Sequence, residues 1–417
     1  MRKYLTTIGI VLTLMFSVVG TISVSAARIF YVSQTGSGTA CTISVPCAIS
    51  TALGAVQGGD TINIVGVMSP VVLSKSGTVS APITITGGIF DGATSSAGEV
   101  VFITGNYVTL ENMEIRNGYN FGVRVKGDHV TLRNISVHNN IRQYWNGSRC
   151  AQTSSQSWGA GVRFAPESDY ATIEDSDVYY NCGEGIGLVG SSYTTIKNNN
   201  VYDSYSMIVY IDEGRNARVE SNTISCSLSG YYKSGSPARG VSYGDEGDAG
   251  TGYTQADIIN NTVSGCKGVS FYDQFGTSKI INSSITGNIF DPAYSPSISI
   301  PSGKTSNVII SNNVGSGFSA PGATLTANYT PTPVGITSTP SATFTSTETP
   351  TITSTFTITP TVFGATATPT ITLTPTLTPT ATRTPTPTRT PSPTVTATPR
   401  CYEYYPEPGV VVTVCFY

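Results

Sequence analysis

A single carboxylate lies among glycines in the middle of this chain. Residues 181–190 read NCGEGIGLVG, in which four glycines surround Glu184. Glycine weakens an ordinary strand because it offers no side chain for packing, and it often marks a place where a ligand approaches the backbone. The stretch therefore predicts a binding surface with Glu184 at its edge. The alternative is that the glycines form tight turns and Glu184 is only solvated.

Two strand-like segments beside this stretch carry ionisable side chains that fit the same chemistry. Arg163 lies in GVRF, and Asp212 ends IVYID. A carboxylate can move a proton, and a guanidinium can hold a substrate carboxylate by two hydrogen bonds. We expect Glu184, Asp212 and Arg163 to carry any catalysis. If they lie exposed on a groove floor, alanine there should hardly change the stability of the fold.

These residue types suit two reactions on a sugar polymer. A lyase that acts on a uronate needs the substrate carboxylate neutralised, by Arg, Lys or Ca²⁺, and a base for the C5 proton. A glycoside hydrolase needs two carboxylates across the bond, one of them protonated. The lyase is the first expectation and the hydrolase the second.

Further polar and aromatic residues near these segments are candidates for substrate binding, because aromatic rings suit the apolar faces of sugars. They are Arg124, Trp145, Trp158, Asp203, Tyr210 and Glu213. The acidic run of Asp245, Glu246 and Asp248 would suit Ca²⁺, the one cofactor that the sequence indicates. The alternative for any one acid in this Gly-rich loop is simple solvation.

A repeating eight-residue frame predicts what positions these residues. It runs from VTLENMEI (108–115) to NVIISNNV (307–314), with apolar residues at the third and eighth positions and Asn, Asp or Ser at the fifth. Most frames are 22 or 23 residues apart, and two long insertions and a shorter one interrupt the spacing. The units are rich in β-formers and lack both a helical pattern and the leucine signature of leucine-rich repeats. They predict a parallel β-helix of about ten coils.

Two further rows of the frame are interpreted as structural. The fourth position alternates in charge, so that neighbouring coils attract: Glu111, Arg133, Glu174, Lys197 and Glu220. His138, Tyr179 and Tyr202 also fall in one row, which favours a stack of rings over a catalytic histidine. The segment CAISTALGAVQGGD (47–60) has a short helical pattern and would cover the open end of the solenoid.

The two long insertions predict a cleft. The first, 139–160, precedes GVRF, and the second lies on both sides of GVSY (240–243). The uninterrupted coils between them hold GIGL and IVYI, so NCGEGIGLVG would form the floor. The aromatic residues of the loops would form its walls: Tyr144, Trp145, Trp158, Tyr231 and Tyr232.

Charge and composition narrow the function classes. The net charge of −3 and the 11% of charged residues make nucleic acid a poor partner. Two histidines leave little room for a His-based metal site or a Ser-His-Asp triad. Residues 116–163 hold seven basic side chains and one acidic, whereas 164–257 hold fourteen acidic and five basic. Basic coils beside an acidic loop fit a uronate substrate.

The two ends of the chain predict export and a stalk. Residues 1–26 have the basic start, apolar run and small-residue cleavage pattern of a secretory signal, and no later segment could span a membrane. After a β-helix domain at 27–327, residues 328–400 form a Thr/Pro-rich linker. Residues 401–417 fold into a small hairpin around a PEPGV turn.

Eight cysteines in an exported chain favour disulfides over metal thiolates. The frame places Cys226 and Cys266 one position apart on successive coils, and Cys150 lies in the loop before the coil that leads to Cys182. The terminal cysteines are close in sequence. We expect four pairs: Cys41–Cys47, Cys150–Cys182, Cys226–Cys266 and Cys401–Cys415.

The chain resembles secreted right-handed parallel β-helix proteins of the pectate-lyase-like superfamily. The resemblance rests on FYVSQTGSGTAC, AISTALGAVQGGDTINIVG, GTVSAPITITG and the Asn-rich coils, and it covers about residues 28–320. It implies an all-β, right-handed, single-stranded parallel β-helix with a C-terminal stalk. The catalytic motifs of polygalacturonases, common pectate lyases and mannuronan epimerases are absent, so no catalytic residue is transferred.

Together these observations predict a secreted or cell-surface monomer that acts on an acidic, uronate-containing polysaccharide in a lyase-like manner. The alternative is a non-catalytic glycan-binding or surface-display protein, in which the solenoid is a rigid scaffold.

Overall fold

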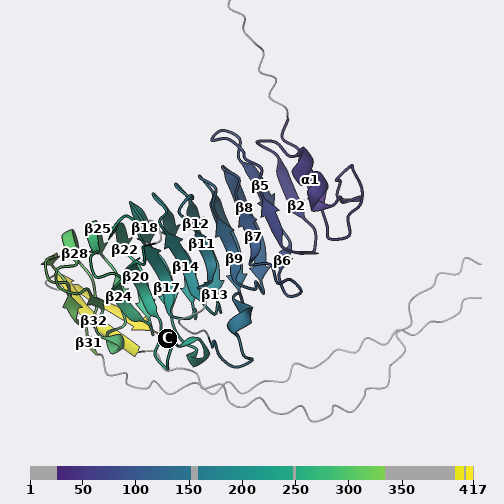
Figure 1. The fold of residues 1–417 in the computed structure, drawn as a ribbon. Helices are drawn as coiled ribbons and strands as arrows, with labels where there is room; N and C mark the ends of the chain where they lie inside the picture. Colours follow the sequence, from purple (N-terminus) through teal and green to yellow (C-terminus); the bar gives the residue numbers. More distant parts are fainter. Residues whose placement is uncertain (1–25, 152–157, 248–249, 334–399, 408–409, 417) are drawn as a thin grey trace, which may run out of the picture.

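The protein is a right-handed parallel β-helix. Its computed structural model describes residues 26–151, 158–247, 250–333, 400–407 and 410–416. The coils stack in sequence order from α1 to β28 (Figure 1). The expected signal segment, apart from Ala26, and nearly all of the Thr/Pro-rich tract lie outside the described residues. Within those residues, no helix is long and apolar enough to cross a membrane.

The described strands of the solenoid form two parallel sheets. The ten-stranded sheet takes one strand from each coil, in keeping with about ten coils: β4 Val71–Leu73, β7 Glu99–Ile103, β9 Phe121–Val125, β11 Ala160–Phe164, β14 Glu184–Val189, β17 Met207–Asp212, β20 Arg239–Asp245, β24 Lys267–Asp273, β27 Ile298–Ser299 and β29 Phe318–Ser319.

The twenty-stranded sheet follows the eight-residue frame and bends at its fifth position. Its strands are β1 Ile29–Val32, β2 Thr61–Ile64, β3 Val67–Met68, β5 Ile83–Thr86, β6 Ile89–Asp91, β8 Val108–Arg116, β10 Thr131–His138, β12 Thr172–Glu174, β13 Asp177–Tyr179, β15 Thr195–Lys197, β16 Asn200–Tyr202, β18 Ala217–Glu220, β19 Thr223–Ser225, β21 Tyr253–Thr254, β22 Ala256–Ile259, β23 Thr262–Ser264, β25 Lys279–Thr286, β26 Ile289–Phe290, β28 Thr305–Ser311 and β30 Thr324–Thr326.

Left-handed residues make the bend possible. The fifth frame position has a positive φ in successive coils, for example 54° at Asn112, 49° at Asn134 and 56° at Asn198. Asn and Asp tolerate this conformation better than most residues. The third and eighth positions then turn inward, and Leu110 and Val137 are fully buried in the apolar core.

A ladder of asparagines, buried except at its partly exposed end, follows directly after the bend. The Nδ2 of Asn222 donates to Ile196 O and to Asn261 Oδ1, both at 2.9 Å, and its Oδ1 accepts from the backbone N–H and Nδ2 of Asn199. The pattern repeats through later coils: Asn199, Asn222, Asn261, Asn288, Asn313 and Asn328. The ladder pairs backbone groups that would otherwise be unsatisfied where the strands break.

The two predicted structural rows are confirmed. Lys197 pairs with Glu174 at 2.8 Å, and Arg133 pairs with Glu111. The ring of His138 stacks on Tyr179 at 4.7 Å between centroids, and Tyr179 stacks on Tyr202 at 4.8 Å.

The predicted frame is wrong in its last two coils. Ile258 pairs with Ile285 rather than Ile280, because β25 contains an extra left-handed corner at Asn282. The next coil shifts as well, so that Ile310 is fully buried and Ile309 is 47% exposed.

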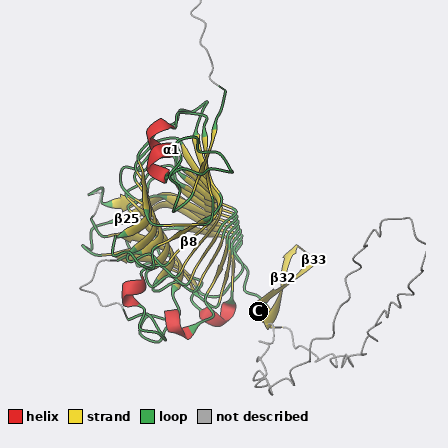
Figure 2. Cartoon of the chain, turned by 90° about the vertical axis from the view of Figure 1, so that its right-hand side faces the viewer, coloured by secondary structure: helices red, strands yellow, loops and turns green. Residues whose placement is uncertain are grey.

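Both ends of the described solenoid carry additional elements. Helix α1 Ile49–Ala55 lies at the N-terminal end, with Ala52 buried, which confirms the predicted cover. Three short 3₁₀ helices gather along one side of the coils (Figure 2): η1 Arg142–Tyr144, η2 Ser229–Tyr231 and η3 Pro292–Tyr294.

All four predicted disulfides are present, and the described residues hold no free cysteine.

The C-terminal hairpin pairs back onto the end of the solenoid domain. β32 Arg400–Glu407 and β33 Val410–Phe416 are antiparallel, with Tyr402 opposite Val414, as the sequence predicted. β31 Thr332–Pro333 adds a third strand, and Arg400 lies 4.0 Å from Asp291. The residues on either side of the Thr/Pro-rich tract are therefore neighbours.

Candidate functional site

The three residues expected to carry catalysis come from adjacent strands. Arg163 lies on β11, Glu184 starts β14 and Asp212 ends β17, and these strands pair in that order. The prediction that they occupy consecutive coils is confirmed. None lies on an open floor, because Glu184 is 5% exposed and Asp212 1% exposed.

Glu184 and Arg163 form an ion pair across Gly187. Nη2 of Arg163 donates to Oε2 of Glu184 at 2.8 Å. A Cβ added to Gly187 would overlap the Glu184 carboxylate and lie 2.9 Å from Nε of Arg163. The space above Gly187 is therefore filled by this pair, and not left open for a ligand as the sequence suggested.

Two of the other three glycines of this stretch, Gly185 and Gly190, also have structural reasons. A Cβ on Gly185 would lie 2.5 Å from Ile208 O of the next coil, so glycine is required for the close approach of the coils. Gly190 has a φ of +64°, which marks a turn. The turn alternative was thus correct for Gly190.

A hollow of about 250 Å³ lies over β9 and β11 beside the ion pair. Its walls combine two guanidiniums with apolar groups: Phe121, Arg124, Arg163, Ala165, Pro166 and Val189. Both guanidiniums lie 5.6 Å from the Phe121 ring centroid, and Arg124 also pairs with Glu99 at 3.0 Å. Nε of Arg163 is buried and has no hydrogen-bond partner among the described residues. We call this the arginine hollow.

Tyr210 and Asp212 belong to a buried network on the acidic side of the sheet. The Tyr210 hydroxyl donates to Oε1 of Glu246 at 3.0 Å, and Asp212 Oδ1 accepts the Glu246 backbone N–H at 2.9 Å. The ring of Tyr210 covers Gly244, where a Cβ would overlap it. Burial, and then the charges of Asp212, Glu246 and Glu184, raise the pKa of Tyr210 far above its usual value, so the phenol keeps its proton.

Asp203 and Glu213 hold the insertion loops in place. Asp203 accepts the backbone N–H groups of Ser227 at 2.6 Å and Leu228 at 2.8 Å. Glu213 accepts the Thr251 N–H at 2.7 Å. Both are buried, so neither presents a free carboxylate to a substrate in this arrangement.

The structure gives no support to a metal site at the acidic run. Within the described residues, no three His, Cys, Asp or Glu side chains converge closely enough to hold an ion. Asp245 is buried, and Glu246 is engaged with Tyr210. Asp248 lies outside the described residues, so the Ca²⁺ hypothesis stays a prediction.

The two insertions contact each other instead of forming opposite walls. Cys150 N–H donates to Gly230 O at 2.9 Å, and the Trp145 ring stacks on Tyr231 at 5.3 Å. The loop aromatics form a second apolar cluster around Ile141, Cys150, Cys182, Tyr205 and Tyr231, against which Tyr144, Trp158 and Tyr180 pack. Tyr232 packs against the main core. The predicted aromatic walls are therefore largely a small core.

Lys233 is a candidate functional residue that the sequence analysis did not identify. It lies in a turn whose next residues, Ser234 and Gly235, have positive φ, and its ammonium lies 4.4 Å from the Trp158 ring centroid. Burial and then Arg239 lower the pKa of Lys233, while Glu246 opposes the shift. The sequence KSGS (233–236), which is typical of a tight turn, was the feature that could have indicated Lys233.

The fold neutralises much of the uneven charge seen in the sequence. Arg116 pairs with Asp91 at 2.8 Å, and Arg124 pairs with Glu99. Lys126 pairs with Glu167 at 3.1 Å. Because the acidic partners lie mostly outside residues 116–163, counting charge in that window overstated the basic field.

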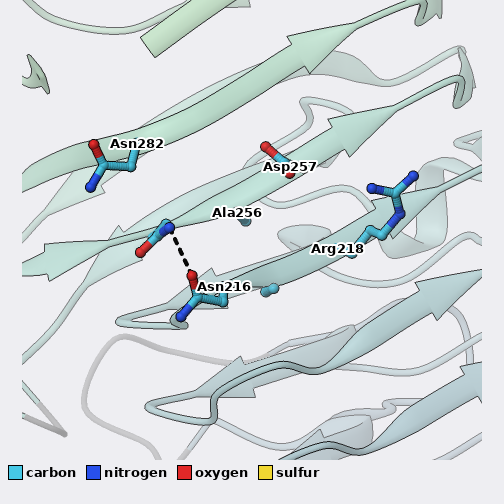
Figure 3. Close-up of a pocket in the computed structure, with 7 residues that line it drawn as sticks. Asn216, Arg218, Ala256, Asp257 and Asn282 are labelled. Carbon is cyan, nitrogen blue, oxygen red and sulfur yellow. Dashed lines mark hydrogen bonds between the residues drawn. The ribbon is translucent and has the colours of Figure 1, made fainter. Parts of the chain in front are cut away.

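A further hollow of about 230 Å³ lies on the twenty-stranded sheet, at the shift in register (Figure 3). The Gln255 amide donates to Asn216 Oδ1 at 2.9 Å, and Asp257 accepts from Ser284 N–H. Asn282, the extra corner, also lines it. The hollow is the gap that the inserted corner leaves, so we do not assign it a ligand.

Comparisons with known proteins agree with the fold. The family described as right-handed beta helix region matches residues 71–238 and 145–314, which together span more than half of the chain. No curated protein sequence matches significantly.

Three solved structures illustrate the similarity. Pectate lyase Pel9A is 18% identical, with a TM-score of 0.49 over 73% of this chain and 79% of that one. Alginate lyase from Paenibacillus sp. str. FPU-7 is 17% identical, with a TM-score of 0.44 over 67% and 99%. The A-module of the Azotobacter vinelandii mannuronan C-5 epimerase AlgE6 is 15% identical, with a TM-score of 0.45 over 73% and 89%. At these identities the likeness concerns the fold alone.

Proposed function

The chain belongs to the right-handed β-helix family, and on that premise we propose that it binds and cleaves an acidic polysaccharide outside the cell. Proteins of this fold act by means of sites on the coils, so the proposal is argued from the site and not from the fold.

The arginine hollow is the observation that carries this proposal. Arg124 and Arg163 bring two guanidiniums to an apolar surface formed by Phe121, Pro166 and Val189. A guanidinium binds a carboxylate with two parallel hydrogen bonds, and the apolar groups suit the C–H face of a sugar ring. The Arg163 side chain is 14% exposed, so part of it reaches the hollow while its Nε stays buried. A uronate ring has both features: a carboxylate for the guanidiniums and a C–H face for the apolar groups.

The reaction that we propose for the arginine hollow is a β-elimination. Arg163 would hold the uronate carboxylate, which makes the C5 proton more acidic. Glu184 would accept that proton as the C4–C5 double bond forms and the bond from C4 to the leaving oxygen breaks. The leaving oxygen would take a proton from water. Asp212 would act as a positioning residue, because it holds the backbone of Glu246 and thereby the partner of Tyr210.

The remaining parts of the proposal concern location and cofactor. Four disulfides suit an oxidising compartment, which favours secretion of the chain. Ca²⁺ at Asp245, Glu246 and Asp248 is the cofactor to test, because it would neutralise a second uronate.

Turnover on a panel of polymers tests the proposal. Polygalacturonate, alginate and glycosaminoglycans are incubated with the protein, with and without Ca²⁺, and ultraviolet absorbance of the unsaturated product is followed. Arg163→Gln should lower the rate by about a hundredfold or more if the guanidinium contacts the reacting ring. Arg218→Gln, a change on the other sheet, serves as the control. No unsaturated product from any acidic polymer would rule out the lyase.

A non-catalytic glycan-binding or display protein is the second candidate. One observation favours it: the oxygens of Asp212, Asp203 and Glu213 accept backbone N–H groups of the insertion loops. Carboxylates in such use hold structure and are poorly placed to move protons. Saturable binding of an acidic polymer without product, lost in Arg163→Gln, would support this candidate.

A further inference from the structure

We propose that a third hollow, lined in part by the stacked rings of the two insertion loops, binds one acidic sugar ring of the polymer. It measures about 190 Å³, smaller than the ~300–1,000 Å³ typical of drug-sized ligands, so a single ring is a suitable occupant. It is lined by Asn117, Asn139, Asn140, Arg142, Trp145, Tyr180, Cys182 and Tyr231, and we call it the loop pocket. The inference rests on the proposed substrate class, but not on catalysis.

The local backbone creates the concave side of the loop pocket. Asn117, Asn139 and Tyr180 have φ values of 59°, 56° and 54°, so three coils turn sharply at the same level. Behind them, Asn140 is buried; its Oδ1 accepts from Gly118 N–H at 2.7 Å, and its Nδ2 donates to Asn181 at 3.0 Å. Asn140 therefore lines the pocket with a side chain whose amide oxygen and nitrogen already have hydrogen-bond partners. Asn139, by contrast, is exposed at the rim.

A braced stack of rings forms the aromatic side. Trp145 stacks on Tyr231, and Tyr231 stacks on Tyr180 at 5.4 Å. Tyr180 in turn packs edge-on against Tyr179 at 4.9 Å. Burial, then Tyr180 and Asp203, raise the pKa of Tyr231 to about 12, so its hydroxyl stays a donor at neutral pH. The rings are fixed before any ligand arrives, which lowers the entropic cost of binding.

The disulfide of Cys150 with Cys182 adds to this rigidity. Cys182 lines the pocket, and Cys150 belongs to the insertion that carries Trp145. The aromatic loop is thus covalently tied to the coil that carries the left-handed Tyr180.

Arg142 supplies the charge. Its Nε donates to Asn117 O at 3.0 Å and its Nη2 to Ser95 O at 2.5 Å, so backbone carbonyls hold the guanidinium in position. No described carboxylate forms an ion pair with it, in contrast to Arg124 and Arg163. A cation that is held only by neutral groups keeps its full attraction for an anion.

The chemistry of the ligand follows from these walls. A guanidinium without a counter-charge selects an anionic group, ring edges and hydroxyls suit a sugar, and the rim amide of Asn139 can bond sugar hydroxyls. A uronate ring meets all three conditions. None of the lining residues is shared with the arginine hollow, so the two sites can be tested separately.

Tryptophan fluorescence can report on the loop pocket directly. Trp145 and Trp158 are the only tryptophans in the chain, so Trp158→Phe leaves Trp145 as the sole reporter. This variant is titrated with galacturonate and mannuronate oligosaccharides, and with the same oligosaccharides after reduction of their carboxyl groups. We expect a saturable change of Trp145 emission with the acidic oligosaccharides and at least about tenfold weaker binding of the reduced ones.

A charge change at the rim provides the matched variant. Asn139→Asp, made in the Trp158→Phe background, should weaken the response about tenfold, because it adds a like charge beside the anion. Asp suits a left-handed position nearly as well as Asn. Asn112→Asp is the control, since Asn112 is also exposed with a φ of 54° but lies on another face.

Three outcomes would overturn the inference: no saturable change of Trp145 emission, an equal response to reduced oligosaccharides, or loss of the response in Arg163→Gln, which would place its origin in the arginine hollow. A silent Trp145 in a variant that still yields unsaturated product would leave the lyase standing. A Trp145 response without product would leave the loop pocket standing and remove the lyase.

Discussion

Nη2 of Arg163 on β11 lies 2.8 Å from Oε2 of Glu184 on β14, and the two side chains meet over Gly187 of β14. The pair is nearly buried, with 14% of the Arg163 side chain and 6% of the Glu184 side chain exposed. The bare glycine and the carboxylate are thus two parts of one arrangement, because the missing side chain is what admits the ion pair.

Gly187→Ala should separate this pair. The new methyl group would displace the Glu184 carboxylate and leave the Arg163 guanidinium with less compensation, at a cost of about 3 kcal/mol in the free energy of unfolding. Chemical denaturation measures the change. Gly98→Ala is the control, since nothing lies within 4 Å of its added Cβ, and it should change stability by no more than about 1 kcal/mol. Equal effects of the two substitutions would contradict this account.

Substitutions at Glu184 and Asp212 should destabilise the fold, contrary to the expectation from the sequence. Glu184→Ala leaves a largely buried guanidinium without this partner, and Asp212→Ala leaves the Glu246 N–H without its acceptor, which costs about 1–3 kcal/mol. A double-mutant cycle of Glu184→Gln and Arg163→Met should show a coupling energy of about 1–3 kcal/mol. An unchanged thermal midpoint in Asp212→Ala would show that the loop does not depend on this contact.

The asparagine ladder should be least tolerant in its middle. Asn222→Leu leaves Ile196 O and the Asn199 N–H without partners in the core, at about 1–3 kcal/mol for each group. Asn328→Leu, at the partly exposed end of the ladder, should cost less than half as much. Urea denaturation of both variants gives the comparison, and a larger loss for Asn328 would refute the ranking.

Acid should weaken the fold through Asp273. Burial raises the pKa of this carboxyl, but Lys304 at 2.6 Å and the backbone N–H groups of Gly276 and Ser278 outweigh burial and hold the pKa below its ordinary value. A lowered folded-state pKa contributes stability above the unfolded value of about 3.9, and this contribution is lost as the pH falls through the folded pKa.

Asp273→Asn should therefore destabilise the protein at neutral pH and cost progressively less as the medium becomes acidic. Urea denaturation of both proteins at about pH 7 and about pH 3 measures the difference. Asp60, Asp91 and Glu167 also have lowered pKa values and contribute an acid dependence that the two proteins share. A cost of Asp273→Asn that does not depend on pH would exclude the charge as its cause.

The repeat made most of the fold predictable, because apolar rows and left-handed corners leave a periodic trace. The predicted register was wrong in the coil where two isoleucines fit the same apolar row. Ile280 and Ile285 are both fully buried, so hydrophobicity could not tell which one continues the row of Ile258. The discriminating residue was Asn288, the partner of Asn261 in the ladder. Sixth-position asparagines had no assigned role in the frame, although they recur in the sequence.

The site was less predictable, because contacts between distant segments leave no periodic trace. Consecutive strands correctly brought Arg163 to Glu184. That Trp145 would pack against Tyr231, 86 residues later, depends on loop conformations that the sequence does not encode as a pattern. The same holds for Asp203 and Asp212, whose carboxylates accept N–H groups from the insertions. These acidic residues beside the long insertions were predicted to bind substrate or catalyse, whereas in the structure they hold the insertion loops by hydrogen bonds.

The pairing of β31 with β32 has a consequence for how this chain can vary. Thr332 lies opposite Glu403, so the Thr/Pro-rich tract starts and ends at the same place. A repetitive tract gains and loses units easily, and a spacer of changed length would normally carry its terminal module to a new distance. Here the hairpin keeps its position whatever the length, and each doubling of the closed segment costs only about 0.6 kcal/mol. A change in the number of residues between these two strands should therefore leave Thr332 opposite Glu403.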